Sequence, residues 1–180
     1  MHRYEKWARL QIEWEQMRDE TIRNLKFPFS YREGQFNLAA SVYRTIARKK
    51  KLFIQAPTGT GKTMAVLYPA VRAMGEGLGE KIFYLTARTI TRTVAEQAFF
   101  ILKEKGLKFR SVTLTAKEKI CFCEKAECNP QACPYAKGHF DRVNDAVYDL
   151  LKNGGGMGRK EIEEQAEKFQ VCPFEFALDL

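Results

Sequence analysis

The chain has no apolar run that approaches the roughly 20 residues needed to cross a membrane. Its first residues, Met1 to Trp7, also lack the apolar core of a secretory signal peptide. A length of 180 residues and a hydrophobic share of 45% allow one ordinary domain, or one and a half small ones. We therefore expect a folded cytoplasmic protein, nucleoid-associated if the source is bacterial, with no membrane partner.

Acidic residues are scarce in the middle of the chain. Residues 27–116 hold 15 basic and 5 acidic residues, whereas residues 1–26 hold 6 and 5, and residues 117–180 hold 9 and 12. A nucleic acid partner accounts for this excess, although a bound nucleotide and ordinary solvated lysines also explain part of it. We interpret the run from Arg48 to Lys51 as a solvated turn.

A phosphate-binding loop is the motif around which the other features are arranged. Its glycines let backbone N–H groups turn inward on a phosphate, Lys62 would reach the outer phosphates, and Thr63 would ligate Mg2+. The general pattern begins with Gly, and the variant that begins with Ala indicates helicases. The loop consists of Ala56, Pro57, Thr58, Gly59, Thr60, Gly61, Lys62 and Thr63.

Short apolar segments alternate with helical patterns through the basic region. This rhythm predicts a parallel β-sheet with helices on both faces, because the crossovers between parallel strands carry the helices. In the second helix we expect Ile90, Val94 and Leu102 to point inward. The expected strands are residues 51–56, 81–86 and 109–114, and the expected helices are residues 61–74 and 89–105.

Two helices are expected before the phosphate loop. Apolar residues from Trp7 to Met17 recur at three- and four-residue steps, which is typical of an amphipathic helix. The capping-box pattern of Ser30 and Glu33 then predicts a second helix that runs to about Arg48. Gln35 lies on it, and its amide could bond both N6 and N7 of adenine in one plane. The alternative is an exposed helical glutamine without that role.

Five cysteines gather in the last third of the chain, where a reducing compartment favours metal or cluster ligands over disulfides. The spacing suits an iron–sulfur cluster better than the close cysteine pairs of zinc fingers. Cys123 is the expected spare thiol, because it stands too close to Cys121 for both to serve easily. His139 is expected to be a surface residue at the start of a helix over residues 139–152, and residues 159–169 form another. The predicted ligands are Cys121, Cys128, Cys133 and Cys172.

The order of these motifs resembles the XPD and DinG-like iron–sulfur helicases of superfamily two. Residues 27–35 resemble that family's adenine-side motif, residues 56–63 its Walker A loop, and residues 86–89 its motif Ia. Cys133 and Cys172 are each followed by proline, and these two segments resemble the family's segments around the third and fourth cluster ligands. The resemblance covers roughly residues 27–180.

This resemblance implies a partial RecA-like P-loop NTPase domain, an α/β fold, into which a small iron–sulfur domain is inserted. Its cofactors would be ATP, Mg2+ and a 4Fe-4S cluster. A monomeric protein would translocate on single-stranded DNA and separate forked duplexes, with a role in DNA repair. Lys62 and Thr63 would be catalytic, while Thr86 and Arg88 would touch the DNA backbone.

The same resemblance divides the chain into an amphipathic helix or linker at residues 1–26, a partial motor domain at residues 27–116, and a cluster domain at residues 117–180. An acidic box that ligates Mg2+ and a second motor domain are missing from this sequence. We therefore expect the N-terminal piece of a longer helicase, with little activity alone. The alternative is a non-catalytic nucleotide- and nucleic-acid-binding module with structural zinc, and a small-molecule P-loop kinase ranks below both.

Overall fold

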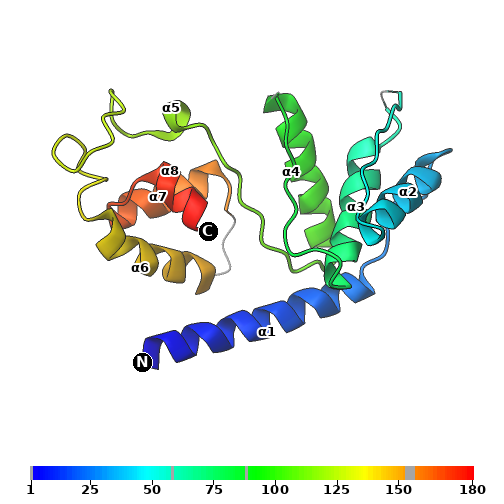
Figure 1. Cartoon of the computed structure of the whole chain (residues 1–180), viewed down its shortest axis with the longest axis horizontal. Helices are drawn as coiled ribbons and strands as arrows, with labels where there is room; N and C mark the ends of the chain where they lie inside the picture. Colours follow the sequence, from blue (N-terminus) through cyan, green and yellow to red (C-terminus); the bar gives the residue numbers. More distant parts are fainter. Residues whose placement is uncertain (1, 58, 88, 153–156) are drawn as a thin grey trace. The chain divides into compact units, whose positions relative to one another are not determined.

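A computed structural model describes residues 2–57, 59–87, 89–152 and 157–180. The chain divides into two compact units, Met1–Phe109 (unit 1) and Arg110–Leu180 (unit 2), each of which is described by itself. The regular secondary structure of the described residues is helical (Figure 1). The helices are α1 (His2–Asn24), α2 (Gln35–Ala47), α3 (Lys62–Gly75), α4 (Thr89–Glu104), α5 (Lys117–Ile120), α6 (His139–Lys152), α7 (Arg159–Phe169) and α8 (Pro173–Asp179).

The expected parallel sheet, and with it the α/β fold class, is wrong for this structure. No strand forms among the described residues, and the isolated parallel bridge joins Val112 to Met157 within unit 2. A parallel sheet is stabilised by burying both of its faces. Here Phe53, Phe83 and Leu85 are 92%, 73% and 88% exposed. Ile82 and Tyr84 pack against the core of unit 1, so only one face of the second extended segment is covered.

Unit 1 is organised around α3, which packs against α1, α2 and α4. Two contacts show that α2 and α3 run side by side in the same direction: Gln35 at the start of α2 bonds Gly61, and Tyr43 near its end bonds Glu76 (Figure 1). The expected Ser30 capping box does not start α2. That helix begins after Gly34, whose φ of 71° places it in the left-handed region.

The ends of α1 and α4 supply the rest of the core of unit 1. Ile22 near the end of α1 is 1% exposed, and Leu102 near the end of α4 is fully buried at 0%. The inward orientation expected for the first half of α4 is wrong, because Ile90 and Val94 are 79% and 43% exposed. Their side chains lack the neighbours that the missing sheet would have supplied.

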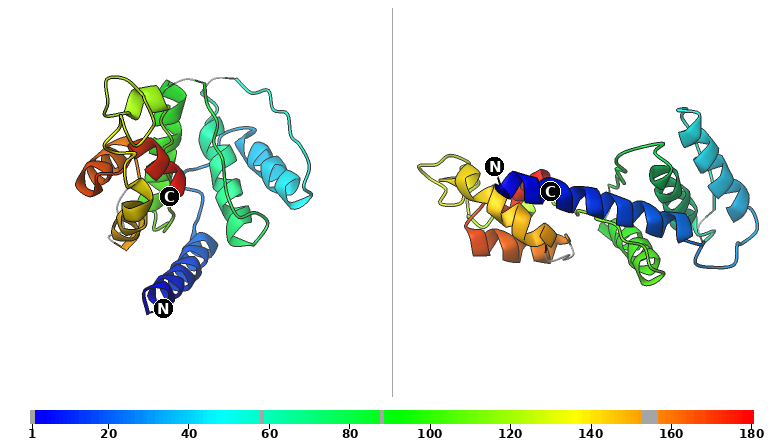
Figure 2. Two further views of the ribbon diagram at one scale, coloured as in Figure 1. Left: turned by 60° about the vertical axis from the view of Figure 1, so that its left-hand side comes forward. Right: turned by 90° about the horizontal axis from the view of Figure 1, so that it is seen from below.

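The long helix α1 is one continuous helix that is anchored at its C-terminal end (Figure 2). The Arg72 guanidinium donates to the carbonyls of Ile22 at 3.0 Å and Arg23 at 2.8 Å. Leu10 and Met17, on the expected apolar face, remain exposed. In the part of the chain that the structure describes, no helix combines the length and the apolarity that a membrane span requires.

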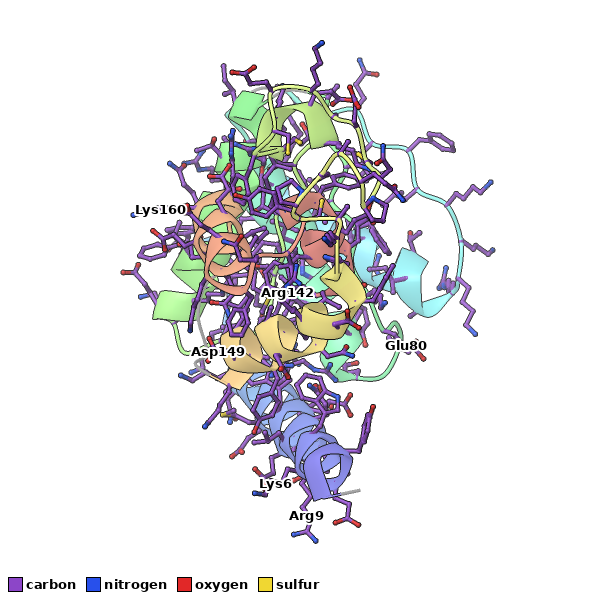
Figure 3. All side chains as sticks on the ribbon, turned by 90° about the vertical axis from the view of Figure 1, so that its left-hand side faces the viewer. Lys6, Arg9, Glu80, Arg142, Asp149 and Lys160 are labelled. Atoms are coloured by element: carbon purple, nitrogen blue, oxygen red, sulfur yellow. The ribbon has the colours of Figure 1, made fainter. Side chains whose placement is uncertain are left out.

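Unit 2 packs α6, α7 and α8 around buried Ile162 and Phe176. The sequence expectation for α6 and α7 is confirmed at both ends of each helix. Figure 3 shows Arg142 and Asp149 along α6, and the Gln165 side chain donates to Asp149 at 2.9 Å from α7. The segment between α5 and α6, which carries four of the cysteines, consists of turns and irregular structure.

Candidate nucleotide-binding site

The phosphate loop leads directly into the first turn of α3. Gly59 and Gly61 have φ values of 83° and 72°, in the left-handed region that glycine adopts without steric cost. Gly61 is the N-cap, so the unpaired N–H groups and the positive dipole end of α3 face the loop. This arrangement is suited to bind an anion. Thr58, one of the predicted cofactor-binding residues, lies outside the described residues.

Lys62, the first residue of α3, folds back over the loop. Its Nζ donates to the carbonyl oxygens of Ala56 at 2.8 Å and Pro57 at 2.5 Å. The Thr60 hydroxyl also donates to the Pro57 carbonyl, at 3.0 Å. Thr63 follows Lys62 in the first turn of α3 and is partly exposed. The structure thus brings the predicted lysine and the loop backbone together at one end of the helix.

Two side chains hold the loop from the other side, one from Arg32 before α2 and one from Gln35 at the first position of α2. The Gln35 Nε2 donates to the Gly61 carbonyl at 3.2 Å, and its Oε1 accepts from the Arg32 backbone N–H at 3.0 Å. The Arg32 guanidinium donates to the Gly59 carbonyl. Gln35 is 5% exposed, so the alternative of an exposed helical glutamine is wrong. Its contact to adenine stays a prediction.

Gly61 and Gln35 approach each other so closely that a larger residue at position 61 would displace the Gln35 amide. A Cβ added to Gly61 would lie 2.4 Å from the Gln35 Nε2. Glycine is therefore favoured here for two reasons, the left-handed backbone and the close side chain. The sequence predicted only that the loop glycines turn backbone N–H groups inward, and it gave no signal of the close side chain.

The predicted DNA-contacting residues lie between this loop and α4. Thr86 is exposed at the end of an extended segment and takes part in an interaction within the chain. Arg88 lies outside the described residues. The DNA-contacting role of this pair stays a prediction.

The cysteines of unit 2 do not gather as a four-thiolate site. Cys123 Sγ lies 3.8 Å from Cys133 Sγ, whereas Cys128 is exposed and contacts the Ala126 carbonyl at 3.5 Å. The hydrogen bond to Cys133, together with burial and the nearby Cys121 thiol, raises the pKa of the Cys123 thiol to about 11. Among the described residues, no group of three or more His, Cys, Asp or Glu side chains could hold a metal ion.

Cys123, which its spacing excluded from the predicted ligands, thus lies next to two of them, Cys133 and Cys121. The spacing of the cysteines could not indicate the contact between Cys123 and Cys133, because the turns between α5 and α6 bring the two thiols together.

His139 is buried, so the expectation of a surface residue is wrong. It starts α6 as expected, but it is only 4% exposed, and its Nδ1 accepts a hydrogen bond of 3.2 Å from the Cys172 backbone N–H. Its Nε2 lies 3.6 Å from Asp179 Oδ2. His139 therefore fixes the chain at Cys172, a role that sequence reasoning missed.

Comparison with known proteins adds independent information on this loop. Residues 37–129 match the family model described as DEAD/DEAH box helicase. A protein of Methanocaldococcus jannaschii, named a probable ATP-dependent helicase, is 43% identical over 179 residues. The match covers 79% of this chain and 28% of that relative, so the chain spans little more than a quarter of its length. No solved structure matches.

Proposed function

Because the chain belongs to the DEAD/DEAH box helicase family, we propose that its loop from Ala56 to Thr63 binds ATP with Mg2+ and forms part of the ATPase site of a DNA helicase. The family membership implies a nucleic acid partner. The related protein of M. jannaschii carries the name probable ATP-dependent helicase. The whole protein would couple ATP hydrolysis to translocation on single-stranded DNA and to separation of forked duplexes.

The observation that carries the proposal is the position of Lys62 at the N-terminus of α3, between the loop carbonyls and the free N–H groups of the helix. Phosphoryl transfer depends on positioning and on neutralisation of phosphate charge. Lys62 would supply that charge, and the Thr63 hydroxyl would ligate Mg2+. Gln35 would hold the loop and lie next to adenine, while Thr86 and Arg88 would contact the DNA backbone.

This chain alone is expected to bind ATP without separating strands. Hydrolysis also requires a carboxylate that ligates Mg2+ and orients water, and the sequence contains no Asp-Glu-x-His box. Robust strand separation by the purified chain would contradict this part of the proposal.

The test is ATP affinity, measured by titration with a fluorescent ATP analogue. The Lys62→Ala variant should lose at least about tenfold in affinity, because a charge-assisted contact to phosphate contributes about 1.5–3 kcal/mol. Lys81→Ala removes the same charge from an exposed position and serves as the matched control. If Lys62→Ala binds ATP as well as the wild type, the loop is not the nucleotide site.

An iron–sulfur cluster is a separate part of the proposal, and its support is the sequence resemblance alone. The described thiols do not fit a four-thiolate site, and the proposed ATP site involves none of them. Iron with labile sulfide after anaerobic purification would support the cluster. Stoichiometric zinc would instead support the alternative, a non-catalytic nucleotide- and nucleic-acid-binding module.

A further inference from the structure

The surface formed by α2 and α3 carries charge of one sign. From Gly34 to Gly75 the chain contains no Asp or Glu, but seven Lys or Arg residues. Two of these have assigned contacts, since Lys62 crosses the phosphate loop and Arg72 bonds the end of α1 and pairs with Glu76 at 3.5 Å. The other five are Arg44, Arg48, Lys49, Lys50 and Lys51, which we call the α2 basic end.

The α2 basic end is exposed and uncompensated. All five residues are exposed, and within the described chain none of their side chains forms a hydrogen bond or an ion pair. The dipole of α2 favours cations in its last turn, which accounts for Arg44 and Arg48. It does not account for three further lysines after the helix.

Lys49 holds a backbone conformation that normally selects glycine. The Lys49 N–H donates to the Ile46 carbonyl at 2.9 Å, and the Lys50 N–H donates to the Thr45 carbonyl at 3.0 Å. This is the Schellman pattern, in which the residue after the C-cap is left-handed and usually Gly. Lys49 adopts it with φ 52°, a conformation that costs a residue with a Cβ about 1 kcal/mol.

In the described chain, one other non-glycine residue has a positive φ, and there a side-chain hydrogen bond to the local backbone stabilises the left-handed conformation. Gln170 ends α7 with φ 54°, and its side-chain amide bonds the Glu167 carbonyl at 2.9 Å, one turn back. The Lys49 side chain makes no such bond. A strained residue without local compensation points to a function for its side chain.

The α2 basic end is remote from the nucleotide site. Gln35 at the start of α2 touches the phosphate loop at Gly61. With about 1.5 Å per residue, the 13 residues of α2 put its other end about 20 Å away. A nucleotide in the loop cannot reach these lysines, so their partner is a different anion.

In place of the solvated turn expected for Arg48 to Lys51, we propose that the α2 basic end is a second anion-binding surface, which holds the phosphate backbone of a nucleic acid strand. Several cations in succession fit the spaced charges of a polyanion, and the strand needs no particular sequence. The proposal rests on the proposed function for the identity of the polyanion as nucleic acid. It adds a contact region outside the predicted DNA-contacting pair, Thr86 and Arg88.

The test uses the full chain and a labelled oligo(dT), with affinity followed by fluorescence anisotropy over a range of salt concentrations. The triple variant Lys49→Gln, Lys50→Gln and Lys51→Gln should bind about tenfold more weakly. The slope of log affinity against log salt concentration should become shallower by about 2. Each lost phosphate contact on a single strand reduces that slope by about 0.7, and three contacts are removed. The matched control neutralises three exposed lysines of the same unit, Lys103, Lys105 and Lys108.

A second variant separates a binding role from a structural one. Lys49→Gly removes the charge and the left-handed strain together, so its Tm should stay at or above that of the wild type while its DNA affinity falls about twofold to threefold. An unchanged DNA affinity in the triple variant overturns the proposal, and so does an equal loss in the control triple, which would reflect net charge alone.

ATP affinity, measured in parallel, keeps the two proposals apart. It should be unchanged in every variant of the α2 basic end, because that surface is remote from the loop. A chain that binds oligo(dT) through this surface but binds no ATP would refute the nucleotide site alone. If the triple variant loses binding to phosphatidylserine vesicles but keeps its DNA affinity, the partner is a membrane surface and this inference is wrong.

Discussion

The side-chain amide of Gln35 donates a hydrogen bond of 3.2 Å to the backbone carbonyl of Gly61, the N-cap of α3. This bond joins the start of α2 to the end of the phosphate loop across 26 residues of sequence. The other end of the same amide accepts from the Arg32 N–H. Gln35 therefore contacts the backbone of the phosphate loop, the proposed nucleotide site.

The first prediction concerns the base selectivity of Gln35. Gln35→Ala should weaken the binding of ATP and GTP by a similar factor of about ten, because both ends of the amide are bonded to backbone groups that shape the loop. Titration with both nucleotides checks this. A loss confined to ATP would mean that the amide reads adenine instead, as the sequence resemblance implies.

The second prediction concerns the space at Gly61. Gly61→Ala should destabilise unit 1 by about 2–3 kcal/mol, since it combines left-handed strain with a Cβ placed 2.4 Å from Gln35. Gly77→Ala is the matched control: its φ is 75°, but nothing lies within 4 Å of the added Cβ, so it should cost only about 1 kcal/mol. Urea unfolding of both variants measures the difference, and equal losses would show that the close approach contributes nothing.

Local patterns predicted much of this structure. The bounds of α6 and α7 follow from their amphipathic periodicity, which needs only neighbours along the helix. The same holds for the phosphate loop, where Gly61 and Lys62 stand at the start of α3 as their spacing predicts. Such features depend on residues a few positions apart.

Features that depend on distant partners were predicted wrongly or not at all. The segments around Phe53 and Leu85 have strand composition, yet no ladder forms among the described residues, because strand pairing requires neighbours that composition cannot specify. The contact between Cys123 and Cys133 likewise depends on the turns between them. The buried His139 accepts a hydrogen bond from Cys172, 33 residues away.

The third prediction concerns the reactivity of Cys123. Its pKa is raised from 9.0 to about 11, chiefly by the hydrogen bond with Cys133. The reactive thiolate fraction is therefore low at pH 9.0, and alkylation of Cys123 should accelerate only as the pH approaches about 11. The native state also holds this proton more tightly than the unfolded state, so the stability it contributes is lost as the pH rises across this range.

Mass spectrometry after iodoacetamide pulses at a series of pH values measures this reactivity. Cys133→Ser should shift the alkylation midpoint of Cys123 to lower pH, because the sulfur partner is removed. Cys128→Ser should leave the midpoint where it is, since Cys128 is not among the groups that act on Cys123. A midpoint that does not move in Cys133→Ser would contradict the assignment of the contact.

Arg142 on α6 connects three backbone carbonyls of unit 2. Its guanidinium donates to Phe169 at 3.0 Å, to Lys137 at 2.8 Å and to Gln170 at 2.5 Å. These bonds tie the end of the cysteine-bearing segment to the end of α7. A planar guanidinium has several N–H donors at fixed angles and can form these three hydrogen bonds at once. The compact ammonium of a lysine cannot reproduce that geometry.

The fourth prediction follows from these bonds. Arg142→Ala should destabilise unit 2 by about 2–4 kcal/mol, because three carbonyls lose a charged donor, and Arg142→Lys should recover little of that loss. Lys160→Ala is the control on the same unit (Figure 3): its pair with Glu164 spans 3.7 Å between side chains that are 83% and 66% exposed, so we expect a change below about 0.5 kcal/mol. Urea unfolding gives the stabilities, and limited proteolysis between α5 and α6 should accelerate in Arg142→Ala alone. Equal stability of the Arg142 and Lys160 variants would show that the three bonds do not hold this segment.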